Sequence, residues 1–166
     1  MKHELNVAQF LPLERPQVFK FFSDPANLAR ITPPNMGFRM VTPTPLEMAS
    51  GTVIDYRVRV FGIAIRWRSL IEQWDPPRKF VDVQLAGPYK QWVHTHRFLE
   101  QPNGTLIEDH VQYELPLQPI GDLGHWAVRR QLKHIFSFRR ESIERILLPP
   151  GGASPDETRS HSQDRS

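Results

Sequence analysis

The chain has 166 residues, of which 39% are hydrophobic, and its formal net charge is +3 at pH 7. This length suits one domain whose core needs no covalent cross-link. The absence of cysteine excludes disulfides, thiolate metal sites and cysteine nucleophiles. Residues 1–10 lack the continuous apolar run of a signal peptide or a membrane span, so we expect a soluble, cytoplasmic protein.

The positive charge is concentrated in residues 121–148. This segment carries six basic and three acidic residues, which accounts for the whole excess of the chain. We interpret the basic residues as the solvated outer face of a helix. The alternative is a face that binds anions or touches a membrane surface.

The first third of the chain contains signals for one strand and two short helices. Residues 2–10 alternate loosely between two faces, which predicts an opening strand. Pro16 then occupies a first helical turn, and apolar residues recur at helical spacing over residues 18–22. The Ser-Asp-Pro sequence at 23–25 ends this helix and caps a second one, which the two prolines at 33–34 end.

From residue 37 to residue 117 the chain is rich in β-branched and aromatic residues, in runs separated by proline and glycine. Six strands fit these runs, at residues 38–42, 51–60, 63–74, 79–85, 91–100 and 105–117. The Asn103-Gly104 pair is a strong hairpin signal, because these residues readily adopt positive φ. Short connections imply antiparallel neighbours.

The last part of the chain is predicted to be one helix followed by a tail. Apolar residues between 121 and 147 fall at three- and four-residue steps, which is typical of one long amphipathic helix. The Pro-Pro-Gly-Gly sequence at 149–152 ends it, and the serine-rich, charged remainder predicts disorder. We therefore expect a domain over residues 1–148 and a disordered tail over 149–166.

Several short motifs lie on the predicted strands and on the long helix. They are Trp67-Arg68, Phe80-Val-Asp82-Val-Gln84, Gly87-Pro88-Tyr89, Trp92-Val-His94-Thr-His96-Arg-Phe98, Asp109-His-Val-Gln-Tyr113 and Ile135-Phe136 followed by Arg139. Together they resemble those of bacterial ligand-binding SRPBCC proteins often labelled cyclase/dehydrase. The order of elements over residues 2–147 resembles the wider START-like, or helix-grip, superfamily. The resemblance implies an α+β fold with a seven-stranded curved antiparallel sheet wrapped around the long C-terminal helix, and a hydrophobic cavity between them. The family shares no catalytic motif, so it implies no particular reaction.

Alternation along the strands predicts which side chains line such a cavity, because residues two apart share a face. The row formed by Trp92, His94, His96 and Phe98 is the better candidate for the face under the helix. Corresponding rows on the other strands complete the set. The predicted ligand-binding residues are Trp67, Ser69, Phe80, Asp82, Gln84, Trp92, His94, His96, Phe98, Asp109, Tyr113 and Phe136.

The polar members of this set admit more than one interpretation. His94, His96 and Asp82 are candidate acid/base groups, with Asp82 or Asp109 as the orienting carboxylate. They equally suit pocket lining or a structural hydrogen-bonded network. Two histidines two residues apart can also bind a metal ion, but this signal is weak alone, so we expect no metal and no cofactor.

Two other residue types are more often structural than functional. Ser69 lacks the strained turn of a nucleophilic serine, so we interpret it as an ordinary strand residue. Each of the four tryptophans suits core packing, and Trp126 suits the mouth of the cavity as an alternative.

The sequence leaves three functions open. The first is the binding of a small hydrophobic or aromatic metabolite between the sheet and the C-terminal helix. The second is a polyketide cyclase or dehydratase-type enzyme, a lyase or isomerase that uses a cavity His/Asp pair. The third is an anionic-surface binder that uses the basic helix. We expect a small hydrophobic partner, no nucleic acid and no membrane span; the ligand and the oligomeric state are not predicted.

Overall fold

The computed structural model describes residues 1–116 and 124–148. The elements in chain order are β1 (Lys2–Leu11), α1 (Arg15–Phe22), the 3-10 helices η1 (Pro25–Ile31) and η2 (Pro34–Met36), β2 (Arg39–Met40), β3 (Val53–Val60), β4 (Ile63–Asp75), β5 (Lys79–Ala86), β6 (Gln91–Gln101), β7 (Gly104–Glu114) and α3 (His125–Leu147). The predicted tail, and residues 121–123 of the predicted long helix, lie outside the described residues. Within them, no helix is both long and apolar enough to span a membrane.

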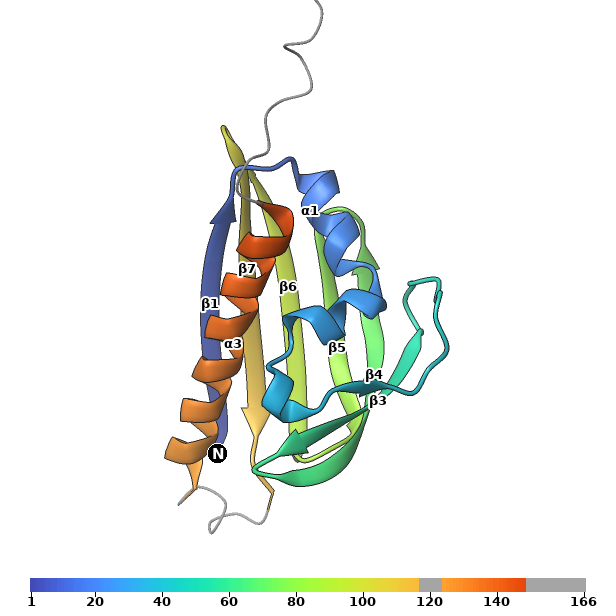
Figure 1. The fold of residues 1–166 in the computed structure, drawn as a ribbon, viewed down its shortest axis with the longest axis vertical. Helices are drawn as coiled ribbons and strands as arrows, with labels where there is room; N and C mark the ends of the chain where they lie inside the picture. The colour runs from blue at the N-terminus through green and yellow to red at the C-terminus, as the bar shows by residue number, and fades with distance from the viewer. Residues whose placement is uncertain (117–123, 149–166) are drawn as a thin grey trace, which may run out of the picture.

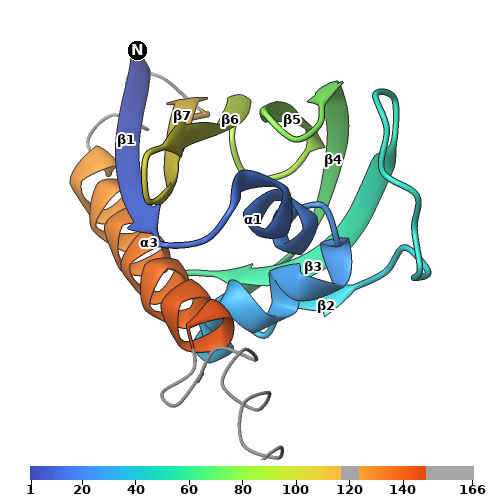
Figure 2. The ribbon, with the colours of Figure 1, turned by 90° about the horizontal axis from the view of Figure 1, so that it is seen from above.

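The strands form one seven-stranded sheet in the order β1-β7-β6-β5-β4-β3-β2, and every neighbouring pair is antiparallel. Register shifts at residues 68/69 and 71/73 of β4 mark irregularities that bend a strand. Seen from above, the strands curve through an arc around α1, and α3 runs past the β1 edge (Figure 2). The predicted α+β helix-grip architecture is confirmed.

The strand predicted at 51–60 begins at Val53, and the one predicted at 105–117 ends at Glu114, with residue 117 outside the described residues. Two other elements differ more from the prediction. The strand predicted at 38–42 pairs in regular register with β3 only at Arg39 and Met40. The amides of Val41 and Thr42 both donate to the Asp55 carbonyl oxygen of β3, at 2.8 and 3.0 Å, so the regular ladder ends before Pro43. The second predicted helix is a 3-10 helix, η1, whose N-cap Asp24 accepts a hydrogen bond from the Ala26 amide at 2.9 Å. The proline pair predicted to end it also begins the further turn η2.

The predicted Asn-Gly hairpin joins β6 to β7, where Gln101 pairs with Gly104. The positive φ belongs to Gly104, at +155°, and not to Asn103. A Cβ atom on Gly104 would collide with the carbonyl oxygen of Leu11 at the end of β1. Glycine is therefore required here for close approach as well as for backbone conformation.

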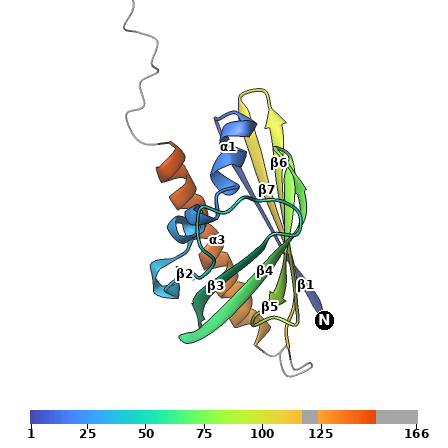
Figure 3. The same ribbon diagram turned by 90° about the vertical axis from the view of Figure 1, so that its right-hand side faces the viewer.

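The helices cover the concave side of the sheet at different distances (Figures 1 and 3). α1 packs against β6 and β7, whereas α3 packs mainly against η1 and the edge strand β1. The Gln9 side chain fixes the β1 contact, because it donates hydrogen bonds to the Arg140 carbonyl oxygen at 3.0 Å and to Glu144 Oε1 at 3.1 Å. α3 is thus supported at the margins of the sheet and spans its centre.

A solid apolar cluster fills the space between α1, the nearby ends of the central strands and the last turns of α3. We call its innermost part the closed end. It comprises Leu11, Val18, Phe19, Phe98, Ile107 and Ile143, none more than 5% exposed. Three phenylalanine pairs here meet edge to face, with ring centroids 5.2–6.1 Å apart, which is the favoured aromatic geometry.

Candidate functional site

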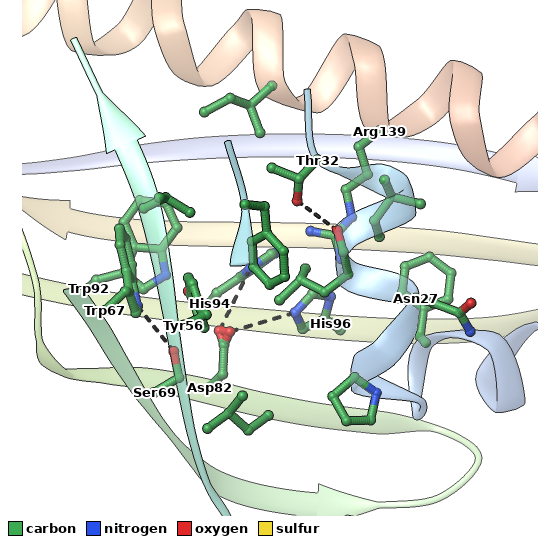
Figure 4. Close-up of a pocket in the computed structure, with 18 of the residues that line it drawn as sticks. Asn27, Thr32, Tyr56, Trp67, Ser69, Asp82, Trp92, His94, His96 and Arg139 are labelled. Carbon is green, nitrogen blue, oxygen red and sulfur yellow. Dashed lines mark hydrogen bonds and ion pairs between the residues drawn. The ribbon is translucent and has the colours of Figure 1, made fainter. Parts of the chain in front are cut away.

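A cavity of about 180 Å³ lies beyond the closed end, bordered by β3 to β6, the η1 and η2 region and α3 (Figure 4). Most of its wall is aromatic or aliphatic. The aromatic wall residues are Phe21, Phe22, Phe38, Tyr56, Trp67, Phe80, Tyr89, Trp92 and Phe136. An apolar wall with a few polar groups is typical of a small-molecule site.

A second hollow, of about 310 Å³, lies at the β6–β7 hairpin. It is lined by Phe10, Gln101, Pro102, Asn103 and Leu106. None of these side chains ionises, and all but Leu106 are exposed. This hollow therefore offers little chemistry, and the first cavity is the candidate site.

The structure brings eight of the predicted ligand-binding residues to the cavity wall. They are Trp67, Ser69, Phe80, Asp82, Trp92, His94, His96 and Phe136. Seven of them come from β4, β5 and β6, where strand alternation determines which side chains face the helices.

Gln84 and Tyr113 do not line the cavity, because each makes a hydrogen bond elsewhere. The Gln84 side chain donates to the Tyr89 carbonyl oxygen at 2.7 Å and accepts from the Tyr89 amide at 3.3 Å, so it fixes the β5–β6 connection. The Tyr113 side chain is 2% exposed, and its hydroxyl lies 3.0 Å from His125 Nε2 at the start of α3. Both face inward as predicted by alternation, but at the margin of the site.

Phe98 and Asp109 also lie behind the cavity wall. Phe98 belongs to the closed end, is 1% exposed and packs against Phe19 at 5.2 Å between ring centroids. Asp109 lies beneath His94 and His96, which separate it from the cavity. Alternation predicts which face of the sheet a side chain lies on, but not how deeply it is buried. Phe98 and Asp109 lie on the predicted face but too deep to line the cavity.

Arg139 and Tyr56 line the cavity but were not among the predicted site residues. Arg139 lies on α3 three residues after Phe136, and its guanidinium carbon lies 5.6 Å from the Phe22 ring centroid and 5.8 Å from that of Phe136. Its Nε atom is buried without a hydrogen-bond partner. A lone cation on the apolar face of a helix was the available signal for it.

Ser69 and the tryptophans are placed by packing. Ser69 Oγ accepts a hydrogen bond from Trp67 Nε1 at 3.1 Å. Trp74 packs against Phe19 beside the closed end. Trp126 is 70% exposed, so the predictions that it packs the core or lines the cavity mouth are wrong.

The polar part of the wall is built by the registers of three neighbouring strands. Asp82 on β5 pairs with His94 on β6, and His96 pairs with Asp109 on β7. His94 and His96 share a face because they are two residues apart, and their rings lie against each other with centroids 3.7 Å apart and planes tilted by 38°. We call these four residues the histidine cluster.

The two carboxylates of the cluster differ in their distance from the imidazole rings: Asp109 is close and Asp82 is farther away. Asp109 Oδ1 lies 2.9 Å from His94 Nε2, which is a hydrogen bond, and 2.8 Å from His96 Nδ1, without hydrogen-bond alignment. Asp82 lies farther away, 3.9 Å from His94 Nδ1 and 4.0 Å from His96 Nε2. Both imidazoles are almost fully buried, whereas the Asp82 side chain is 20% exposed towards the cavity.

The cluster and Arg139 hold both carboxylates in the charged form. Burial acts to raise the pKa of Asp109, but the charge of Arg139 and the contacts with the two histidines outweigh it and bring the pKa well below its usual range. Burial likewise opposes ionisation of Asp82, and the contact with His96 and the charges of both imidazoles and Arg139 lower its pKa.

The two histidines are shifted in opposite directions. Burial lowers the pKa of His94, and the charge of His96 adds to that effect against the pull of Asp109. Burial also acts to lower the pKa of His96, but its contacts with Asp109 and Asp82 raise it above the usual value. Two adjacent imidazoles with diverging pKa values form an arrangement that can hold one proton between two carboxylates.

Comparison with known proteins rests on structure alone. No protein-family model matches the chain, and no curated protein matches it. The ZhuI aromatase/cyclase from Streptomyces sp. R1128 superposes with a TM-score of 0.72 at 16% identity, over 92% of this chain and 100% of that one. A START superfamily protein from Mycobacterium smegmatis superposes with a TM-score of 0.66 at 12% identity, over 87% of this chain and 99% of that one. The chain has the START-like fold.

In a third matching structure, the START-like fold is one part of a larger protein. The nucleoside-diphosphate sugar epimerase from Corynebacterium glutamicum superposes with a TM-score of 0.64 at 25% identity, over 86% of this chain but only 29% of that one. The same fold thus occurs in proteins whose names indicate different functions, so chemistry must be argued from the cavity. In this START-like chain, the histidine cluster can orient a ligand, transfer a proton or bind a cation.

Proposed function

We propose that this protein binds a small, largely apolar metabolite in the cavity between the sheet and α3. The observation that carries the proposal is a partly open hollow of about 180 Å³ whose wall is mostly aromatic and aliphatic. Transfer of apolar ligand surface from water into such a hollow supplies the driving force.

An aromatic ligand suits the wall best. Trp67 and Trp92 meet edge to face at 5.3 Å, and Tyr56 stacks on Trp67 at 5.9 Å, so flat rings border the hollow on one side. Asp82, His94, His96 and Arg139 supply the polar groups of the wall, and the His94 ring centroid lies 6.3 Å from that of Trp92. The ligand would place its apolar ring among the tryptophans and its polar substituent at the histidine cluster.

The other two predicted functions relate to this one differently. A cyclase or dehydratase would bind its substrate in the same cavity, so binding is common to both proposals, and the aromatase/cyclase named above has the same fold. The basic face of α3 is exposed at Arg129, Arg130 and Lys133, and none of these three residues lines the candidate cavity. Binding in the hollow is therefore the function that the geometry supports best.

The experiment is a titration of the full chain with the fluorescent apolar probe N-phenyl-1-naphthylamine, alongside native mass spectrometry of freshly purified protein. We expect one probe molecule to bind per chain and to quench the tryptophan emission of Trp67 and Trp92. Ile135→Trp places a large ring in the cavity from α3 and should weaken probe binding at least 10-fold.

The matched control is His134→Trp, which adds the same ring one residue earlier on the exposed face of α3. It should leave probe affinity unchanged. Circular dichroism and thermal melts establish that both variants are folded. Absence of saturable binding by the wild type, or equal binding by both variants, would overturn the proposal.

A further inference from the structure

The starting observation is that Asp109 engages the far nitrogen of each imidazole. Its Oδ1 atom lies 2.9 Å from His94 Nε2 and 2.8 Å from His96 Nδ1. A neutral imidazole has one N–H and one lone pair, so a ring that directs its N–H to Asp109 presents its lone pair on the opposite side. For His94, the hydrogen bond to Asp109 leaves Nδ1 free. For His96, Nδ1 lies close to Asp109 Oδ1 without hydrogen-bond alignment, so it is the negative charge of the carboxylate that favours a proton on Nδ1 and leaves Nε2 free.

The free nitrogens of both rings point towards the same acceptor group, Asp82 (Figure 4). His94 Nδ1 lies 3.9 Å from Asp82 Oδ2, and His96 Nε2 lies 4.0 Å from Asp82 Oδ1. Both distances are too long for hydrogen bonds, and Asp82 Oδ2 is buried without any hydrogen-bond partner. Two lone pairs and a carboxylate thus face one another around a shared gap, an arrangement that a cation in the gap would stabilise.

We propose that Asp82, His94 and His96 bind one divalent transition-metal ion of the zinc class in the wall of the cavity. One ligand atom from each residue lies within 4.8 Å of the other two. Two imidazole nitrogens and one carboxylate oxygen are a donor set preferred by such ions. At metal–ligand distances of about 2.0–2.2 Å, the donors would be roughly 3–3.5 Å apart. The gaps of 3.9 and 4.0 Å between Asp82 and the imidazoles must then contract by about 0.5–1 Å, and a donor pair at the 4.8 Å limit by about 1–2 Å.

Asp109 acts as a positioning residue for this site. Histidine ligands commonly direct their second nitrogen to a carboxylate, which fixes the ring orientation and makes the metal-bound nitrogen more basic. Here one carboxylate serves both rings, because β6 places them two residues apart and the β6–β7 register places Asp109 opposite His96. Asp109 occupies the closed side of the cluster, which leaves the cavity side of the metal free for a further ligand atom.

Formal charge agrees with a cation in the gap. With neutral imidazoles, Asp82, Asp109 and Arg139 together carry one net negative charge inside an apolar wall. A divalent ion changes this sum to one net positive charge, which would favour an anionic or enol-type oxygen on a ligand in the cavity. The guanidinium carbon of Arg139 lies over the rings of Phe22 and Phe136, 5.6 and 5.8 Å from their centroids.

The test uses the full chain after treatment with EDTA, titrated calorimetrically with Zn²⁺ and followed by visible absorption with Co²⁺. We expect one ion per chain and cobalt bands of nitrogen–oxygen coordination. His94→Ala and His96→Ala should each lower affinity at least 100-fold. Asp109→Asn should lower affinity about 10- to 100-fold with the stoichiometry unchanged, which separates positioning from coordination.

Two control variants exclude binding elsewhere. His134→Ala removes an exposed imidazole from α3. His125→Ala removes one ring of the His3–His125 pair, whose centroids are 3.6 Å apart and which is the rival site for added metal. Neither change should alter Zn²⁺ affinity by more than about 2-fold, and loss of binding in His125→Ala would overturn the proposal.

The metal site can also be tested on the wild-type protein, without relying on the folding of the alanine variants. Proton NMR of wild-type protein with bound Co²⁺ should show strongly shifted imidazole resonances from two histidines, and their assignment to any pair other than His94 and His96 would refute the site. A wild-type chain that binds no stoichiometric ion would overturn the proposal. The titration needs no organic ligand, so it is independent of the proposed binding function.

Discussion

The closed end and the cavity are built on the same central strands, yet one is solid and the other is hollow. At the closed end, α1 follows β1 closely in the chain and packs directly against β6 and β7. Over the cavity, α3 contacts mainly η1 and β1, so the centre of the sheet lacks a close helix. Helix support at the margins rather than over the centre explains the hollow.

The side chains differ between the two regions in the same sense. The closed end is purely apolar, and its phenylalanines interlock. The aromatic surface of the cavity wall is interrupted by a carboxylate, two imidazoles and a guanidinium, with a second carboxylate one layer behind. Buried polar groups are costly unless something occupies the hollow or pairs with them, so the contrast indicates where a ligand belongs.

The largest expected effect comes from truncating the same side chain in each region. Ile107→Ala, in the closed end, removes a 2%-exposed side chain that packs on all sides and should lower the free energy of unfolding by about 3–5 kcal/mol. Ile54→Ala, in the cavity wall, should cost about 1–2 kcal/mol less, because that side chain already borders empty space.

Urea denaturation at equilibrium measures both values on the same chain. Each variant should retain the wild-type dependence on denaturant, which shows that only native stability has changed. Equal losses at the two positions would mean that Ile54 is packed as tightly as Ile107. The cavity wall and the closed end would then not differ in packing, which contradicts the prediction.

The sequence predicted which side chains of each strand face the helices, but not which of them belong to the closed end and which to the cavity wall. Alternation placed Trp92, His94, His96 and Phe98 on one row, and the structure places all four inward. The same row runs from the cavity into the closed end, so Phe98 is core while Trp92 is wall. The alternation of residues along a strand does not show which helix covers each residue, because helix placement depends on long-range packing.

The polar cluster shows the same limit. Spacing identified His94 and His96 as neighbours, whereas strand order alone brings Asp109 beneath them and Asp82 above them. The register between neighbouring strands is set by hairpin geometry and bulges, which local patterns predict poorly. Arg139 was missed for a different reason: its place three residues after Phe136 puts it on the apolar face of α3, but the helix carries several exposed arginines, and the basic residues were interpreted together as a solvated face.

A second expected effect concerns the tyrosines, two of which line the cavity. Burial raises the pKa of Tyr56, and the negative charge of Asp82 raises it further. Burial also raises the pKa of Tyr89. It raises the pKa of Tyr113 as well, although the positive charge of Arg129 acts to lower it. Above pH 10 the unfolded chain releases phenol protons that the folded chain keeps, so stability falls as pH rises. Each cavity tyrosine contributes up to about 1.4 kcal/mol per pH unit.

Ultraviolet titration distinguishes a dry cavity from a wet one. The chain has three tyrosines, and phenolate absorbance should stay low near pH 10 to 11 until the protein unfolds. In denaturant all three should titrate near the ordinary tyrosine pKa of about 10. Phenolate formation in folded protein at pH 10 would indicate that water fills the hollow and lowers the cost of charging Tyr56 and Tyr89.

The third prediction concerns the hydrogen bonds that hold α3 over the hollow. Gln9→Leu preserves side-chain size but removes the bonds to the Arg140 carbonyl oxygen and Glu144, and should lower the free energy of unfolding by about 2 kcal/mol. Gln112→Leu removes an exposed bond to Glu4 at 2.9 Å and should cost less than about 0.5 kcal/mol. Similar losses would show that α3 is held by apolar packing alone.

The smallest predicted effect is a matched pair of hydroxyl deletions. Thr105, in the strand beside the closed end, is 0% exposed and donates to the Leu13 carbonyl oxygen at 2.8 Å, so Thr105→Val should cost about 1 kcal/mol. Ser69→Ala removes the acceptor of the Trp67 indole N–H at the cavity wall and should cost less than about 0.5 kcal/mol, because water or a ligand in the hollow can replace it. Thermal unfolding resolves the difference, and a larger loss at Ser69 would show that the hollow admits no substitute partner and is closed to guests.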